Sequence, residues 1–250
     1  MPRIVLEVEY LGTHYYGWQR QISSLPSIQG TLEAALEKIV QHPVTTVAAG
    51  RTDRGVHARR QTVHFDANVV RQMDAYISGV NHFLPGDIRV HQAKEVADTF
   101  HARFSAQARS YQYLILNDRV GSAISENRVL WHPIPLDAGT MAEGAKYLVG
   151  AHDFSSFRGR DCQAKSPHKT VHFCTVKRES NLIVLDIKAD GFLHHMVRNI
   201  VGVLIQIGEG RHAPEWVVEV FAAKDRTAAA MTIPPEGLYF MEAEYPWTSV

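Results

Sequence analysis

The chain has 250 residues, enough for one large domain or for two of about 100–150 residues each, and enough to bury a hydrophobic core. Hydrophobic residues make up 45% and charged residues 21%, ordinary values that exclude disorder, collagen and coiled coil as descriptions of the whole chain. Lys plus Arg and Asp plus Glu both number 26, so the formal net charge is zero and any basic surface must be local.

Two cysteines, Cys162 and Cys174, are too few for a disulfide framework or a cysteine zinc site, which favours a reducing compartment. Glu7 and Glu9 stand where a signal peptide needs an apolar run. The longest apolar stretch, around 200–207, is far shorter than the roughly 20 residues that span a bilayer. We expect a soluble, cytoplasmic protein that does not contact membranes.

In the first half of the chain, alternation of apolar and polar residues predicts a half-buried strand over 4–10. Apolar residues at helical spacing predict a helix over 28–39, capped by Ser27, and another over 73–84. Further strands are expected at 43–50, 61–67 and 87–96. The segment 51–58, RTDRGVHA, has no apolar period and is expected to be a loop.

The second half has a similar make-up. Its predicted strands are 109–117, 170–178, 182–189 and 238–244. Its predicted helices are 136–148, capped by Asp137, together with 193–207 and 215–223.

Strands follow one another too often for a βαβ array, so an α+β fold with an antiparallel or mixed sheet is expected. A weak boundary falls near 104–108. We therefore expect an N-terminal half over 1–105 and a C-terminal half over 106–250, tightly joined, with a cleft between them.

The most informative segment is AGRTDRGVHA, residues 49–58. One carboxylate, Asp53, stands between Arg51 and Arg54, and Gly50 and Gly55 permit backbone geometry closed to other residues. A carboxylate held in such a loop can act as a nucleophile or a general base. From the residues alone, a salt-bridged surface turn explains the segment equally well.

This loop resembles the catalytic loop of the tRNA pseudouridine synthase A family. The likeness extends from about residue 4 to residue 245, because further segments resemble that family in the same order: YYGWQRQ, SIQGTLEAAL, NHFLPGDIRV, FHARFSAQARSYQYLI, HDFSSFR, FLHHMVRNIVG, AAKDRT and EGLYF. One variation is Arg54, which stands where the family often has a small residue and adds a cation beside the carboxylate.

The resemblance implies an isomerase that converts uridine to pseudouridine at positions 38, 39 and 40, in the anticodon stem-loop of tRNA. It implies the α+β pseudouridine synthase fold, with two similar α/β halves around a continuous mixed, largely antiparallel sheet and a central basic cleft. It also implies a homodimer with tRNA spanning both subunits. No cofactor is expected, since the reaction is neither a redox step nor a hydrolysis, and the sequence has no common nucleotide-binding or metal motif.

The resemblance also assigns site residues. It makes Asp53 the nucleophile, Tyr111 the aromatic that stacks on the target base, and Arg198 the cation that pairs with and orients Asp53. By the same analogy Arg51 contacts phosphate and Leu238 packs against the base. As ordinary structure, Tyr111 is a cross-strand aromatic, Arg198 lies over apolar neighbours and Leu238 is a core residue.

The basic character is local. One stretch carries six cations with one acid before Glu179: Arg158, Arg160, Lys165, Lys169, Lys177 and Arg178. Such residues bind a phosphate backbone without reading sequence. Four more arginines would add to it if the halves face each other: Arg59, Arg60, Arg103 and Arg109. Tyr113, two residues beyond Tyr111, is expected in the core.

No metal site is expected. His194 and His195 are adjacent on a predicted helix and converge poorly. Two alternatives to the isomerase remain: a non-catalytic RNA-binding module, and a His-dependent metallohydrolase suggested by the 14 histidines. Activity on unmodified tRNA tests the first, and metal analysis tests the second.

Overall fold

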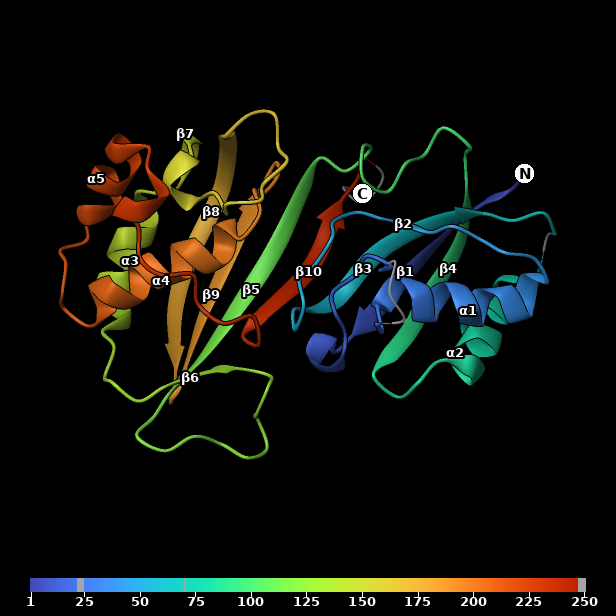
Figure 1. The fold of residues 1–250 in the computed structure, drawn as a ribbon, viewed down its shortest axis with the longest axis horizontal. Coiled ribbons are helices and arrows are strands. Elements are labelled where there is room, and N and C mark those ends of the chain that lie inside the picture. The colour runs from blue at the N-terminus through green and yellow to red at the C-terminus, as the bar shows by residue number, and fades with distance from the viewer. Residues whose placement is uncertain (22–24, 70, 247–250) are drawn as a thin grey trace. The chain divides into compact units, whose positions relative to one another are not determined.

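The computed structural model describes residues 1–21, 25–69 and 71–246, and it divides into two compact units (Figure 1). The first unit comprises Met1–Gln107 with Tyr239–Val250, and the second comprises Ala108–Leu238. The boundary expected near 104–108 puts everything after residue 105 in one C-terminal half. The observed division differs for the last strand, which from Tyr239 on is grouped with the first unit and pairs with β3.

The sheet of the first unit has the strand order β4 (Ile88–Val96), β1 (Arg3–Tyr10), β3 (His57–Asp66), β10 (Leu238–Glu244). Strand β1 is antiparallel to both of its neighbours. Strand β10 runs parallel to β3, with Tyr239 opposite His57 and Phe240 opposite Ala58. The short strand β2 (Val47–Ala48) also pairs with β3, so the predicted strand at 43–50 is reduced to two residues.

Helix α1 (Ile28–Val40) begins where expected, because the hydroxyl of Ser27 accepts a hydrogen bond from the Gly30 amide at 3.2 Å. The predicted helix at 73–84 is instead a π-helical turn, η2 (Ala75–Gly79), followed by α2 (Val80–Phe83). It ends before Pro85, as predicted. Helices α1 and α2 pack beside each other (Figure 1).

Alternate residues of β1 are buried, which confirms the predicted half-buried strand. Its solvent side carries ion pairs with β3: Arg59 with Glu9 at 2.6 Å and Arg60 with Glu7 at 3.0 Å. Two of the arginines counted as possible tRNA contacts are therefore already paired with carboxylates.

Within the second unit the strands lie in the order β5 (Ala108–Asn117), β9 (Leu182–Ala189), β8 (His168–Glu179), β7 (Gly150–Asp153). All three pairings along this path are antiparallel. Strand β6 (Leu130–His132) pairs in parallel with β5. Strands β6 and β7 are not among the predicted strands, because they are short and carry no alternating pattern of burial.

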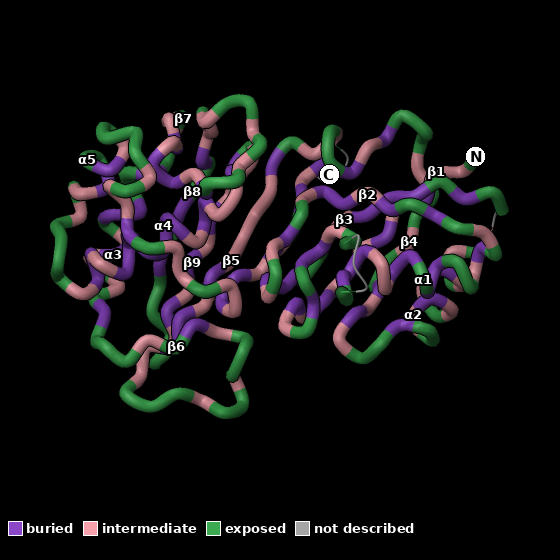
Figure 2. The backbone as a smooth tube through the Cα atoms, in the orientation of Figure 1, coloured by how far each residue is buried: buried purple, intermediate pink, exposed green. Residues whose placement is uncertain are grey.

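Helices α3 (Ala138–Lys146), α4 (Met196–Gly208) and α5 (Trp216–Ala223) complete the second unit. Asp137 caps α3 as predicted. Helix α4 is buried along most of its length and packs against α3, and it forms the centre of this unit's core (Figure 2). It begins three residues later than predicted, because His195 has a left-handed backbone with φ of 61°. Across the described residues, no helix is both long and apolar enough to cross a bilayer.

Candidate active site

The loop that carries Asp53 connects β2 to β3 and makes a tight turn. The Val56 amide donates to the Asp53 carbonyl at 3.2 Å, and Gly55 takes a φ of 80° that favours glycine. Asp53 is half-buried, whereas Arg51 and Arg54 are exposed. The loop predicted from RTDRGVHA is confirmed as far as Val56, after which β3 begins at His57.

Buried side chains of the sheet hold this loop from behind. The Tyr10 hydroxyl lies 2.8 Å from Oγ1 of Thr52, the residue before Asp53. Nε2 of Gln61 donates to the Gly50 carbonyl at 2.7 Å and to the Tyr10 hydroxyl at 3.3 Å. Burial raises the pKa of Tyr10 to about 12, so its hydroxyl keeps its proton near neutral pH.

The segment YYGWQRQ lies directly against the loop. The Trp18 amide donates to the Thr52 carbonyl at 3.0 Å. Gly17 has a φ of 91°, and a Cβ there would lie 2.8 Å from the Thr52 carbonyl oxygen. Glycine is therefore required at this position for both its conformation and the close approach. The Arg54 guanidinium lies over the Tyr16 ring, 4.4 Å from its centroid.

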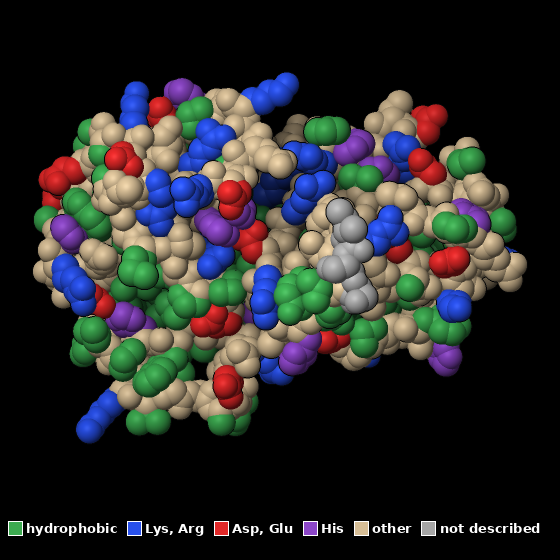
Figure 3. Space-filling model, viewed as in Figure 1, with side chains coloured by type: hydrophobic (Ala, Val, Ile, Leu, Met, Phe, Trp, Pro, Cys, Tyr) green, Lys and Arg blue, Asp and Glu red, His purple; other side chains and the backbone are tan. Residues whose placement is uncertain are grey.

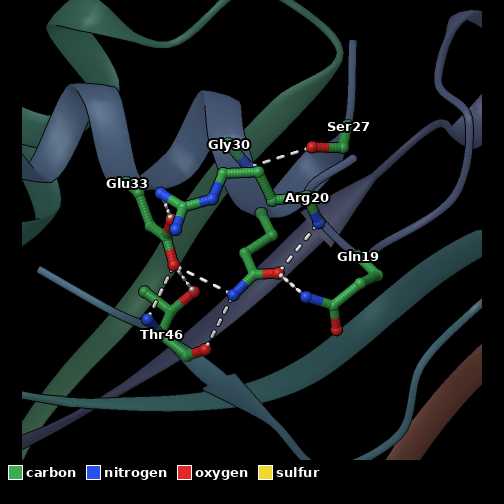
Figure 4. Close-up of polar contacts among 7 residues, drawn as sticks. Gln19, Arg20, Ser27, Gly30, Glu33 and Thr46 are labelled. Carbon is green, nitrogen blue, oxygen red and sulfur yellow. Dashed lines mark hydrogen bonds and ion pairs between the residues drawn. The ribbon is translucent and has the colours of Figure 1, made fainter. Parts of the chain in front are cut away.

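The far end of that segment is fixed to α1 by a polar cluster (Figure 4). Oε1 of Gln29 accepts from the Arg20 amide at 2.9 Å and from the Gln19 side chain at 2.8 Å. Glu33, itself buried, accepts from the Thr46 amide at 2.8 Å and pairs with Arg20 at 3.1 Å. The segment is thus held at the loop by Trp18 and at the helix by this cluster.

In the second unit, Tyr111 lies on β5 opposite Ile187 of β9. It is half-buried, and its ring meets that of Phe192 edge to face, with centroids 4.9 Å apart. Tyr113 is fully buried and donates its hydroxyl to the Pro234 carbonyl at 2.8 Å. Burial raises its pKa well above the ordinary value. The prediction that Tyr113 belongs to the core is confirmed.

Arg198 lies on α4 and is half-buried, with its Nε donating to the Ile233 carbonyl at 2.7 Å. Leu238 is buried at the start of β10, and its amide donates to the Pro235 carbonyl at 2.9 Å. The structure therefore places Asp53 and Arg51 in the first unit, and Tyr111, Arg198 and Leu238 in the second. That these five residues form one site stays a prediction.

The cations of the basic stretch 158–178 differ in their surroundings. The guanidinium of Arg158 donates to the carbonyls of Cys162 and Ala164 at 2.7 and 2.8 Å, and so holds the loop that follows it. Arg178 similarly donates to the Leu136 carbonyl at 2.6 Å. Arg160 and Lys165 are exposed. Lys and Arg side chains gather on the face of the second unit seen in Figure 3.

Three polar residues to which the sequence gives no role form a network in the second unit: Asn199, Arg226 and Thr232. Asn199 and Arg226 lie in the segments FLHHMVRNIVG and AAKDRT, whose resemblance to the family was the one available signal. Thr232, which lies outside every quoted segment, carried no signal of its own.

A comparison with known protein families shows which family the chain belongs to. A family model described as tRNA pseudouridine synthase matches residues 7–105 and 145–246. This chain belongs to that family. The matched ranges include Asp53, Arg51, Arg198 and Leu238, whereas Tyr111 lies between them.

Individual relatives agree over nearly the whole chain. "tRNA pseudouridine synthase A" of Pseudomonas aeruginosa is 51% identical over 246 residues, covering 98% of this chain and 86% of the relative. The proteins of the same name from Alcanivorax borkumensis and Shewanella woodyi are 48% and 49% identical, with 98% of this chain covered in both and 92% and 93% of the relatives. Among solved structures, a Cbf5–Nop10–Gar1 complex is matched over 95% of this chain and 48% of that chain, at 11% identity and a TM-score of 0.41, too weak a likeness to bear on the fold.

These findings confirm the family inferred from the sequence motifs, and with it the isomerase class. The α+β fold class is confirmed by the same family and by the mixture of helices and sheets in the two units.

Proposed function

We propose that this protein isomerises uridine to pseudouridine in the anticodon stem-loop of tRNA, at positions 38, 39 and 40. Membership of the tRNA pseudouridine synthase family is the observation that carries the proposal. The anchored loop around Asp53 supports it, because a catalytic carboxylate needs a fixed position, and Tyr10, Gln61 and Trp18 hold its backbone.

The reaction breaks the bond between uracil N1 and ribose C1′ and forms a bond between C5 and C1′. The base turns between these two steps, C5 loses its proton, and N1 ends with one, so nothing is gained or lost overall. Asp53 is proposed as the nucleophile. Attack on ribose C1′, attack on the uracil ring, or removal of the C5 proton would each use its carboxylate.

The other residues bind the substrate in this proposal. The half-buried ring of Tyr111 offers an aromatic face for the extruded uracil. Arg198 pairs with Asp53, for which a bidentate guanidinium is well suited. Arg51, exposed beside the nucleophile, contacts phosphate, and Leu238 packs against the base.

We also propose that the protein acts as a homodimer in the cytoplasm, with tRNA as its partner and with no cofactor or metal. The family resemblance supports the dimer. The low number of cysteines supports a reducing compartment.

The deciding experiment incubates the protein with an unmodified tRNA transcript and maps pseudouridine nucleotide by nucleotide. We expect conversion at positions 38, 39 and 40 with chelator present. Asp53→Asn should lower turnover at least ~10³-fold while tRNA affinity stays within a few-fold. Asp74→Asn is the matched control, since Asp74 is exposed in the same unit and its side chain caps nothing.

The alternatives give different results in the same assay. An RNA-binding module would bind the transcript without converting it. A metallohydrolase would lose activity with chelator and regain it with stoichiometric metal. An Asp53→Asn protein that converts uridine at the parental rate would end the proposal for Asp53.

A further inference from the structure

Helix α4 and the segment 226–233 are joined by a polar network that lies next to Arg198. Asn199 is fully buried, and its Oδ1 accepts from Oγ1 of Thr232 at 2.6 Å and from Nη2 of Arg226 at 3.0 Å. Its Nδ2 donates to the Phe157 carbonyl at 2.8 Å. One buried amide therefore joins three stretches of chain that are far apart in sequence.

Arg226 closes the network. Its Nη2 also donates to Oγ1 of Thr232 at 2.9 Å, so Asn199, Thr232 and Arg226 form a triangle of hydrogen bonds. The hydroxyl of Thr232 accepts a hydrogen bond from the Arg226 guanidinium and donates its single proton to the amide oxygen of Asn199. A triangle satisfied in this way has one arrangement and resists reorientation.

The two ends of the network flank a bond made by Arg198. Asn199 follows Arg198 on α4, and Thr232 precedes Ile233, whose carbonyl accepts from Nε of Arg198 at 2.7 Å. Arg198, the donor of that bond, is next to Asn199 in sequence, and Ile233, the acceptor, is next to Thr232. Because a guanidinium is planar, fixing Nε on a carbonyl sets the plane in which its other N–H groups point.

The close approach of the two segments is a separate observation. A Cβ on Gly202, one helical turn after Arg198, would lie 2.5 Å from the Met231 carbonyl oxygen. Glycine at this position lets the segment 230–233 lie directly against the helix backbone. The Ile233 carbonyl is therefore brought to Arg198 both by packing and by the network.

We propose that Thr232, Asn199 and Arg226 are positioning residues for Arg198. They fix the Ile233 carbonyl against α4, and that carbonyl orients the guanidinium that the proposed function pairs with Asp53. The inference rests on the proposed function for its catalytic consequence, but the orientation of Arg198 can be measured without any turnover.

The test compares Thr232→Val, which removes the hydroxyl and keeps the shape, with Thr232→Ser, which keeps the hydroxyl. We expect Thr232→Val to lower kcat about tenfold or more with KM for tRNA within about threefold, as for a group acting on the transition state. Thr232→Ser should return kcat to within about twofold of the parent. Thr140→Val is the control, because it also loses a threonine hydroxyl bond, to the Asp137 carbonyl at 2.9 Å, in the same unit.

A double-mutant cycle and a spectroscopic measurement separate positioning from folding. In an Arg198→Ala background, Thr232→Val should lower kcat no further. The Nε–H resonance of Arg198, identified by its loss in Arg198→Lys, should exchange with solvent at least about tenfold faster in Thr232→Val than in the parent or in Thr140→Val.

Each result has a defined meaning. If Thr232→Val matches Thr140→Val in kcat and in Nε–H exchange, or if its effect persists in Arg198→Ala, the positioning role is wrong. The same holds if Arg198→Ala is fully active. If the parent makes no pseudouridine, the proposed function fails, and the exchange rates alone decide whether the network orients Arg198.

Discussion

The hydroxyl of Tyr10 lies 2.8 Å from Oγ1 of Thr52, and Thr52 immediately precedes Asp53. A hydrogen bond from the end of β1 therefore holds the residue directly before the proposed nucleophile. The Gln61 side chain extends this connection to Gly50, on the other side of Arg51.

Tyr10→Phe should therefore affect catalysis as well as stability. It leaves Thr52 Oγ1 and Gln61 Nε2 without the hydroxyl, which costs about 1–3 kcal/mol of unfolding free energy, and it loosens the loop. We expect kcat to fall by more than the tRNA affinity. Tyr76→Phe, which removes another buried hydroxyl of the first unit, should lower stability alone. Equal kcat values for the two variants would show that the Tyr10 hydroxyl does not position Asp53.

The close contact at Gly17 gives a second prediction. Gly17→Ala adds a Cβ 2.8 Å from the Thr52 carbonyl at a φ of 91°, so both strain and overlap act on the loop. We expect a loss of about 2–4 kcal/mol in chemical denaturation and a fall in kcat. Gly210→Ala is the control for strain alone, since Gly210 has a φ of 74° with nothing within 4 Å of the added Cβ. A loss in Gly17→Ala no larger than in Gly210→Ala would contradict the steric argument.

Two variants of Tyr111 distinguish a stacking role of its ring from a proton-transfer role of its hydroxyl. Its ring, packed edge to face on Phe192, is proposed to stack on uracil, so Tyr111→Phe should keep kcat within about threefold of the parent. Tyr111→Leu removes the aromatic face and should weaken conversion by roughly 10–100-fold, as loss of base stacking does. Single-turnover rates on tRNA transcripts measure both. Tyr113→Phe controls for loss of a hydroxyl on the same strand. An inactive Tyr111→Phe would replace the stacking role with one for the hydroxyl.

Charge at the exposed part of the basic stretch should set tRNA affinity. Reversal of Arg160 and Lys165 to Glu should weaken binding of all tRNAs about equally, by roughly tenfold or more at low salt, and make the dependence on salt less steep. Arg119→Glu with Lys146→Glu changes the net charge of the same unit equally at other exposed positions and should have little effect. Filter binding across a salt series measures both pairs. Equal losses of tRNA affinity in the two double variants would mean that affinity follows the net charge of the protein and not the position of Arg160 and Lys165.

The buried His64 predicts how stability depends on pH. Burial, together with the nearby charges of Arg3 and His101, lowers its pKa from 6.5 to about 4 although Asp66 acts in the opposite direction. Its Nδ1 also accepts from the Ala102 amide at 3.1 Å, which requires an unprotonated nitrogen. Between pH 6.5 and 4 this histidine binds a proton in the unfolded chain but not in the folded one. The free energy of unfolding should therefore decrease as the pH is lowered, by on the order of 2 kcal/mol.

Denaturant melts at pH 7, 6 and 5 test this window. His64→Asn keeps an acceptor for Ala102 without a titrating group and should flatten the dependence. His101 contributes in the same direction, since burial lowers its pKa as well, and it is the reason that some slope should survive in the variant. A parent protein equally stable at pH 7 and pH 5 would be inconsistent with a neutral His64.

Much of the fold was predictable because its signals are local. The alternation in β1, the Ser27 and Asp137 caps, and the long strands β8 and β9 are properties of neighbouring residues. Strands β6 and β7 could not be predicted, because three or four residues are too few to show an alternating pattern. They are defined by their pairing with β5 and β8. The assignment of β10 to the first unit depends likewise on pairing with β3, which no local pattern encodes.

The candidate site shows the same division. The loop around Asp53 stands out because it combines glycines, arginines and a carboxylate within one short segment, but its proposed role depends on the resemblance to the family's catalytic loop, since the residues alone fit a surface turn equally well. The contacts that hold the loop come from Tyr10, Gly17 and Gln61, which are ordinary strand or loop residues until the structure brings them together. Arg158 and Arg178 were grouped with the tRNA-binding cations because sequence does not show that carbonyl groups already accept from them.

The parallel pairing of β10 with His57 and Ala58 has a consequence for biosynthesis. The ribosome makes β2, the Asp53 loop and β3 early, then nearly all of the second unit, and only afterwards the strand that pairs with the first residues of β3. Nascent chains therefore carry an open strand edge at His57 and Ala58, just beyond the Asp53 loop, through most of their elongation, and such an edge is a template for unwanted pairing. A chain released before β10 emerges would contain every proposed active-site residue except Leu238 and would still lack the strand that pairs with β3 directly after the Asp53 loop.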